Sequence, residues 1–340
     1  MPTLTKHENY RRMLRGEDVE FVPHTADATG PNGPAQMSFR EQFVSTVGGW
    51  EPGEVRYDMF GVPYVTERAA NLGALPQPGV FILEDITKWR DVIKRPAIID
   101  EIDFEHFAAI DLPHRDPDAL YGGGPSIGNG YFQMLAAFMG FDNGLIACAE
   151  EPEEVKALME FLVDMNVTMA KKFIKAYSPN SYGMGDDIAH EFAPFVSMDM
   201  FRDIFEPAWR ATVAPYKDAG CHASHHNCGK LDEMIPYIVD MGFDSWNPAE
   251  PQNDLLAIQA EFKGRLAICG GFDGNGMVCW PETTEEEVRG YVRQQVDTLA
   301  PGGSYAFGGG IMGSADDQVA ISRREWISDE FEKIRYSYYN

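Results

Sequence analysis

The sequence predicts a (β/α)8 barrel, also called a TIM barrel, preceded by a short helical extension. In roughly the last 160 residues, short strands alternate with helices of about ten residues or more, a pattern typical of a parallel sheet. No dinucleotide-binding glycine fingerprint follows the first expected strand, which disfavours a doubly wound sheet. Barrels of this type often form one undivided domain, so we expect a single domain over 1–340 with residues 1–20 as the extension.

The elements can be assigned in chain order. Residues 4–17 predict a short helix, 21–26 the first barrel strand, and 84–120, rich in Asp and Pro, a segment on the surface. A long helix is expected up to Tyr177, because Pro152 suits a first helical turn and apolar residues then recur at helical spacing. The remaining strand ends lie in 181–187, 221–229, 243–250, 264–273 and 302–311, and the helices between them in 198–220, 231–241, 254–262 and 283–299.

Charge and composition exclude several classes of partner. Lys and Arg number 28 and Asp and Glu 53, which gives a net charge of −25. Without a basic stretch, binding to nucleic acid or to an anionic membrane surface is not expected. The sequence also shows neither a bilayer-spanning apolar run nor the apolar core of a signal peptide, so we expect a cytoplasmic protein. Its five cysteines fit reduced thiols better than a disulfide framework.

Polar and thiol side chains gather where the expected strands end, which is where barrel enzymes place their chemistry. The concentration of such groups beside apolar strand bodies indicates a site. The candidates are His24, Asp27, Asp186, Asp187, His225, His226, Cys228, Asn247, Glu250, Cys269 and Asp273.

The segment HHNCG at 225–229 gives the strongest indication of a metal. Residues two apart in a strand face the same side, so His226 and Cys228 can point together into the barrel mouth and bind Zn²⁺. His225 would face the other way. A third ligand is needed, and Cys269, at the end of a later strand, is the first choice, with Glu250 second.

Two other motifs leave alternatives open. The pair Asp186–Asp187 could hold a substrate, act as a base, or satisfy backbone groups in a turn. We expect Asp187 to orient the substrate or its leaving group and Asp186 to turn into the loop. The stretch GGGPSIGNG at 122–130 lacks the form of a phosphate-binding loop and is interpreted as a flexible connection.

The region 181–273 resembles the uroporphyrinogen decarboxylase superfamily, which includes the cobamide-dependent methyltransferases. The resemblance rests on GDD at 185–187, SMDMFRDIFEPAW at 197–209, KDAGCHASHHNCG at 217–229, DEMIPYIVDMGFDSWNP at 232–248 and RLAICGGFD at 265–273. Weaker likeness extends over nearly the whole chain. The resemblance implies a (β/α)8 barrel and, on the methyltransferase branch, Zn²⁺ bound by His226 and Cys228.

Departures from the family patterns favour one branch. The decarboxylases of the superfamily that this sequence resembles carry an arginine-rich loop after the first strand. The corresponding loop of this chain, HTADATGPNGP at 24–34, has no Arg or Lys. Methyltransferases of the coenzyme M type take a third zinc ligand, a Cys, from the last strand, where this chain has FGGG at 307–310. The sequence is similar to the corrinoid O-demethylase methyltransferases as well. That similarity implies methyl transfer from a small donor, such as an aromatic methyl ether, to the cob(I)alamin of a separate corrinoid protein.

On this interpretation, the donor would contact His24, Trp246, Asn247 and Phe307, and the corrinoid protein would dock over the mouth beside loops 27–36 and 187–197. Three alternatives remain. The first is a methylcobamide:thiol methyltransferase of the coenzyme M type. The second is a metal-free decarboxylase or lyase of the same fold. The third is a protein that keeps the barrel but only binds the corrinoid or the donor.

Overall fold

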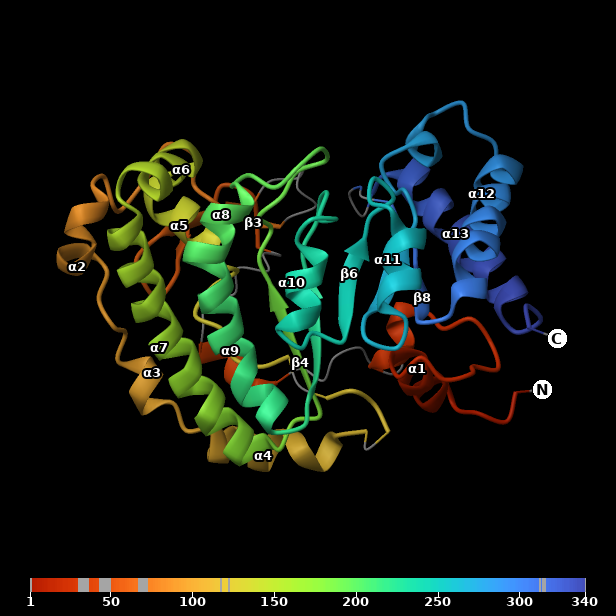
Figure 1. The fold of residues 1–340 in the computed structure, drawn as a ribbon, viewed down its shortest axis with the longest axis horizontal. Helices are drawn as coiled ribbons and strands as arrows, with labels where there is room; N and C mark the ends of the chain where they lie inside the picture. Colours follow the sequence, from red (N-terminus) through yellow and green to blue (C-terminus); the bar gives the residue numbers. More distant parts are fainter. Residues whose placement is uncertain are drawn as a thin grey trace.

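A five-stranded parallel sheet forms the centre of the protein (Figure 1). The computed structural model describes residues 2–29, 37–42, 50–66, 73–116, 118–121, 123–311, 313 and 316–339. The sheet order is that of the chain: β4 (Ser181–Gly185), β5 (His222–His226), β6 (Ser245–Ala249), β7 (Ala267–Gly271) and β8 (Tyr305–Gly308). Figure 1 shows α9, α10 and α11 side by side along the outside of these strands. The predicted α/β class with a parallel sheet is therefore confirmed.

The described residues form the following helices: α1 (Lys6–Leu14), α2 (Trp89–Val92), α3 (Ile98–Glu101), α4 (Phe104–Asp111), α5 (Tyr131–Met139), α6 (Phe141–Glu150), α7 (Pro152–Tyr177), α8 (Met198–Met200), α9 (Glu206–Asp218), α10 (Ile235–Asp240), α11 (Leu255–Phe262), α12 (Glu285–Leu299) and α13 (Gln318–Arg335). Short helical turns are η1 (Thr25–Ala28), η2 (Ser38–Gln42), η4 (Ile86–Lys88), η5 (Leu112–His114), η6 (Phe201–Phe205), η7 (Met277–Cys279) and η8 (Ala300–Gly302).

The segment predicted as the first strand, 21–26, pairs with β8 through a single β-bridge. His24 and Phe307 form a parallel bridge, and the Phe307 amide donates to the Pro23 carbonyl at 2.8 Å. Pairing stops there for two local reasons. Pro23 has no N–H to give to a ladder, and the helical turn η1 begins directly after His24.

Irregular segments continue the ring of backbone hydrogen bonds from η1 back to β4. The Leu120 amide donates to the Ala28 carbonyl at 2.7 Å, and the Asn180 amide, just before β4, donates to the Tyr121 carbonyl at 3.2 Å. In the described part of the chain the barrel is thus closed by these contacts and by five regular strands. A separate antiparallel sheet outside the barrel contains three more described strands, β1 (Arg56–Tyr57), β2 (Pro63–Thr66) and β3 (Ala74–Pro76). The sequence did not predict this sheet.

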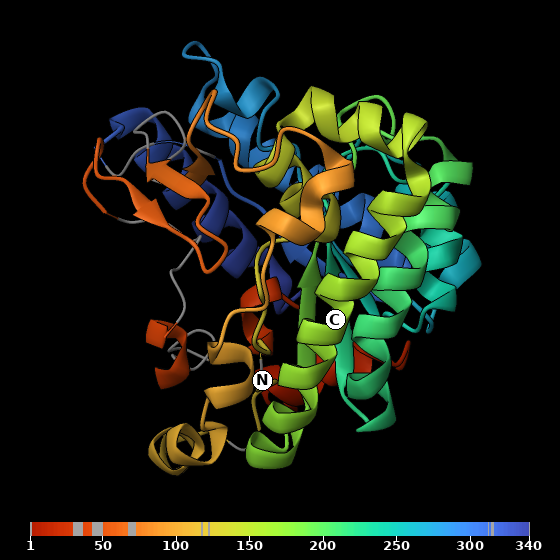
Figure 2. The ribbon, with the colours of Figure 1, turned by 90° about the vertical axis from the view of Figure 1, so that its left-hand side faces the viewer.

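In Figure 2 the small sheet is orange and lies on the opposite side of the view from α7. Helix α7 begins at Pro152 and ends at Tyr177, as predicted, and its expected apolar stripe is buried. No single helix among the described residues is long and apolar enough to cross a membrane. Helices α5 and α6 pass that test only as a pair, which is bent by 109°.

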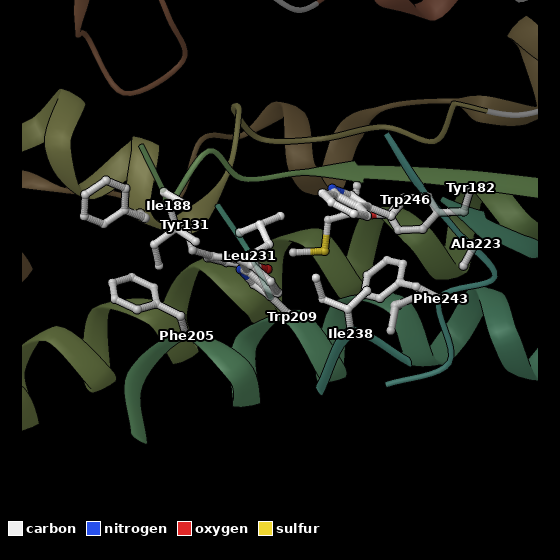
Figure 3. Close-up of a cluster of buried hydrophobic side chains, with 14 of the residues drawn as sticks. Tyr131, Tyr182, Ile188, Phe205, Trp209, Ala223, Leu231, Ile238, Phe243 and Trp246 are labelled. Carbon is white, nitrogen blue, oxygen red and sulfur yellow. The ribbon is translucent and has the colours of Figure 1, made fainter. Parts of the chain in front are cut away.

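The core lies between the outer faces of the strands and the helices (Figure 3). His225 of β5 belongs to it: its ring lies 4.4 Å from that of Trp209 and 4.9 Å from that of Phe243. Trp246 of β6 is fully buried, and its Nε1 donates to the Asn227 carbonyl at 3.0 Å. The outer strand faces are therefore occupied by packing, and the polar residues of the strands are left for the interior.

Candidate functional site

A cavity of about 920 Å³ occupies the inside of the sheet, a size typical of small-molecule sites. Strand β5 shows how the sequence lines it. His222, Ser224 and His226 face the cavity, whereas Ala223 and His225 are buried on the other face. The two-residue period of a strand, used above to pair His226 with Cys228, produces this alternation.

Three potential metal ligands meet at the mouth of the cavity: Asp187, His226 and Cys228. Their ligand atoms lie within 4.8 Å of one another. His226 Nε2 is 3.9 Å from Cys228 Sγ and 3.8 Å from Asp187 Oδ1. Asp187 follows β4 and the other two follow or end β5, so adjacent parallel strands bring the three together.

This donor set fits Zn²⁺. Bonds of about 2.0–2.3 Å in a tetrahedron place ligand atoms about 3.3–3.7 Å apart, so small movements of the side chains would complete the coordination. Nitrogen, thiolate sulfur and carboxylate oxygen are the zinc ligands found in proteins, and three of them leave a fourth position open, as in catalytic zinc sites.

Asn247 of β6 fixes the orientation of His226. Its Oδ1 lies 2.9 Å from His226 Nδ1, and its Nδ2 donates to Ser224 Oγ at 2.8 Å. Since the amide oxygen can only accept, Nδ1 carries the proton and Nε2 presents its lone pair to Cys228 and Asp187. Asn247, predicted to contact the substrate, lines the cavity and also positions this imidazole.

Asp187 is held by two neighbours. Its Oδ1 accepts from the Cys228 amide at 2.9 Å, and its Oδ2 accepts from Gln133 Nε2 at 3.2 Å. Burial, with the carboxylates of Asp187 and Glu250 nearby, raises the pKa of the Cys228 thiol to about 12. A group of this kind becomes a thiolate when a cation binds, since a metal reverses the local electrostatics.

Asp186, a catalytic candidate that the sequence analysis expected to turn into the loop, lies instead against the start of α5 and Trp209. It is fully buried and accepts from the Phe132 and Gln133 amides at 3.1 and 3.2 Å and from Trp209 Nε1 at 2.9 Å. It thus caps the start of α5, and burial raises its pKa to about 6. Gly130 at this helix start is required, because a Cβ there would lie 2.1 Å from the Asp186 carboxyl carbon. GGGPSIGNG therefore ends in a tight packing contact at Gly130.

The two residues expected to supply the third zinc ligand lie outside the mouth cluster. Cys269 lines the cavity two strands away from β5, and its Sγ lies 3.5 Å from the Tyr10 hydroxyl. Burial raises its pKa to about 11. Glu250 also lines the cavity, and its Oε2 accepts from the Gly229 amide and from Gln252 Nε2, the latter at 2.9 Å.

Two residues expected to contact the substrate, Phe307 and Trp246, do not line the cavity. The Phe307 ring stacks on Phe331 of α13 at 4.3 Å, and Trp246 belongs to the core, so neither lines the cavity. Both occupy the outward positions of their strands, which the sequence analysis assigned to the mouth. His24 does line the cavity. Its Nδ1 accepts from the Ala26 amide at 3.0 Å, so the neutral ring carries its proton on Nε2.

Among the cavity and cluster residues that sequence reasoning missed are four polar ones: Gln133, His222, Ser224 and Ser245. The last three could have been found by extending the alternation from His226 and Asn247 back along their strands. Gln133 could not, since it lies on α5, remote in the sequence. None of the described residues that line the cavity is Lys or Arg.

Comparisons with known proteins agree with the fold. The family described as uroporphyrinogen decarboxylase (URO-D) matches residues 118–312. Among solved structures, a methyltransferase from Methanosarcina mazei superposes with a TM-score of 0.59 at 12% sequence identity, over 97% of this chain and 99% of that chain. A search of the curated proteins found no match. The structural likeness shows a shared fold, and the family match covers more than half of the sequence: this chain belongs to the uroporphyrinogen decarboxylase (URO-D) family.

Proposed function

We propose that this protein is a zinc-dependent methyltransferase that moves a methyl group from a small donor to the cob(I)alamin of a separate corrinoid protein. The donor would be an aromatic methyl ether, so that the reaction is an O-demethylation. The observation that carries the proposal is the cluster of Asp187, His226 and Cys228 at the mouth of a cavity large enough for such a donor.

Each part of the site has a task in this reaction. His226, Cys228 and Asp187 would hold the zinc, which as a Lewis acid makes the ether oxygen a better leaving group. Asn247 keeps the imidazole of His226 aimed at the ion. The cavity wall binds the donor, removes water from it and turns its methyl group towards the mouth. The nucleophile is the cobalt of the partner, so this chain needs none of its own.

The solved structure with the same fold is itself called a methyltransferase, which supports this assignment. The partner would dock over the mouth, beside the loop 187–197; the other expected loop, 27–36, lies mostly outside the described residues. A cytoplasmic location remains a prediction from the sequence.

The name of the family suggests a decarboxylase as a second candidate. The charge of the cavity disfavours it, because a substrate with several carboxylates would meet Glu250 and, among the described lining residues, no Lys or Arg. Coenzyme M-type transfer to a thiol is a third candidate. It is disfavoured by the glycines that follow Phe307, where that branch carries a Cys.

Metal analysis of the purified protein tests the proposal first. We expect close to one zinc per chain, lost in the double variant His226→Ala/Cys228→Ser and retained in His225→Ala. Zinc-loaded protein should then transfer a methyl group from methoxybenzene-type donors to the cob(I)alamin of its corrinoid partner. The absorbance change of the corrinoid measures this reaction. Protein that binds no zinc, or zinc-loaded protein that transfers no methyl group from any such donor, would overturn it.

A further inference from the structure

The inner end of the cavity carries a second group of polar side chains, distinct from the mouth cluster. Three residues line the cavity here, and we call them the polar floor: His222 at the beginning of β5, Ser224 at its middle, and Ser245 at the beginning of β6. His222 lies four residues before His226, or about 13 Å along the strand, and Ser224 lies half as far. A donor whose methyl group is at the mouth therefore places its opposite end here.

The polar floor has a defined hydrogen-bond direction. His222 Nδ1 lies 3.4 Å from Asp244 Oδ2, and its Nε2 lies 3.0 Å from Ser245 Oγ. Because the carboxylate can only accept, Nδ1 carries the proton and Nε2 accepts the hydroxyl proton of Ser245. Burial lowers the pKa of His222 to about 4, which agrees with a neutral ring. The Ser245 oxygen keeps lone pairs that can accept from a ligand.

Ser224 complements this arrangement as a donor. Its Oγ accepts from Asn247 Nδ2 at 2.8 Å. Within the described part of the chain its hydroxyl proton has no acceptor, and the side chain lines the cavity. Ser224 can therefore donate one hydrogen bond to a bound molecule, and Ser245 can accept one.

Ser245, His222 and Asp244 contact one another in the order of a Ser-His-Asp triad. The surroundings nevertheless indicate recognition of a ligand and not hydrolysis. Asp244 Oδ2 already accepts from Lys217 Nζ at 2.6 Å and from the Ala223 amide at 2.7 Å. Attack by Ser245 would also require His222 to take up its proton, and burial lowers the pKa of His222 to about 4, which makes it a weak base. The group is better suited to hold a polar substituent in place.

We propose that the polar floor binds an uncharged hydrogen-bonding group, such as a hydroxyl, at the end of the donor remote from its methyl ether. A hydroxyl can accept from Ser224 and donate to Ser245 at once. A carboxylate could use only the first contact, and no cation lines the described cavity to neutralise it. The protein thus selects neutral, hydroxyl-bearing methoxyarenes over methoxybenzoates. The inference rests on the proposed function for the ether but can be tested by binding alone.

Calorimetric titration of zinc-loaded protein compares three probes that differ at one position: 3-methoxybenzyl alcohol, 3-methoxytoluene and 3-methoxybenzoate. We expect the alcohol to bind about tenfold more tightly than the toluene, the worth of one to two net hydrogen bonds. The benzoate should bind more weakly than either. In Ser224→Ala the preference for the alcohol over the toluene should fall to within about twofold.

Two controls separate the possible outcomes. Ser337→Ala, an exposed hydroxyl on the surface, should keep the full preference. Ser245→Ala should also reduce it, which provides a second variant if Ser224→Ala melts at a much lower temperature. Equal affinities for alcohol and toluene in the wild type, tighter binding of the benzoate, a preference untouched by both variants, or no binding of any probe would overturn the inference. Zinc content and methyl transfer, measured on the same samples, report separately on the proposed function.

Discussion

Asn247 Oδ1 lies 2.9 Å from Nδ1 of His226, so a residue of β6 sets the tautomer of an imidazole on β5. Removing this contact should leave the fold intact and loosen the metal site. We expect Asn247→Ala to weaken zinc binding by about 10–100-fold, as is usual for partners of metal-binding histidines. Competition with a chelator of known affinity measures the change. An unaltered zinc affinity would mean that the hydrogen bond does not position the ligand.

Asp187 and Cys269 are the two candidates for the third zinc ligand, and substitutions at these positions distinguish them. The geometry at the mouth favours Asp187, so Asp187→Asn should lower zinc occupancy strongly while Cys269→Ser leaves it near one. Both changes are small, which makes the two proteins matched controls for each other. If Cys269→Ser loses the metal and Asp187→Asn keeps it, the ligand expected from the sequence is the correct one.

Asp186 should make the stability of the fold depend on pH. Burial raises its pKa from 3.8 to about 6, so the folded state binds its proton more tightly than the unfolded state. Its contribution to the free energy of unfolding is therefore largest below about pH 4 and falls as the pH rises to 6. The loss is at most about 3 kcal/mol.

Asp186→Asn cannot titrate, so the wild-type advantage over this variant should shrink between pH 4 and 6 and stay constant above. Urea unfolding of metal-free samples of both proteins checks this, and the comparison cancels the effect of other groups. A wild-type advantage that grows with pH over the same interval would contradict the assignment.

The buried ion pair between Arg335 and Asp27 should be important for stability. Arg335 of α13 is fully buried and also donates to the Val22 carbonyl at 3.1 Å, so it joins the last helix to the segment that bears His24. Arg335→Met leaves the Asp27 carboxylate buried without its partner and should cost about 3–5 kcal/mol. Thermal unfolding measures the loss. The double change Arg335→Met/Asp27→Asn should recover part of it, and no recovery would assign the cost to packing.

The corrinoid partner gives a kinetic prediction. With free cob(I)alamin and a methoxybenzene-type donor, the protein alone should be slow, and its cognate corrinoid protein should accelerate methyl transfer greatly. Because this chain carries a net charge of −25, the acceleration should change with ionic strength if the partner is basic. Equal rates with and without the partner would leave a stand-alone enzyme.

The elements that could be predicted are those whose signal is local. Helix α7 was correct at both ends because Pro152 and the apolar stripe identify a helix without reference to the rest of the chain. The expected strand 21–26 reduced to one rung, since its pairing depends on Pro23 and on β8 nearly 300 residues away. The sheet β1–β3 was missed because its strands are only two to four residues long.

The same distinction holds for the site. Pairing His226 with Cys228 needs only the period of one strand. Placing Asp187 beside them needs the register between β4 and β5, in which Gly185 pairs with His226. Cys269 was favoured because it is a thiol at a strand end and FGGG has no Cys, but β6 lies between its strand, β7, and β5 in the sheet.

Helix α1 packs beneath the barrel, where Tyr10 reaches Cys269 and where a Cβ on Gly16 would lie 2.6 Å from the Gly264 Cα. The two glycines allow the chain to fit this closely, and Tyr10 forms part of the cavity wall at that end. Donor and corrinoid protein would then share the opposite opening. Under the proposed function, the order of events follows: the donor binds first, the partner covers the mouth second, and the demethylated product leaves only after the partner has dissociated.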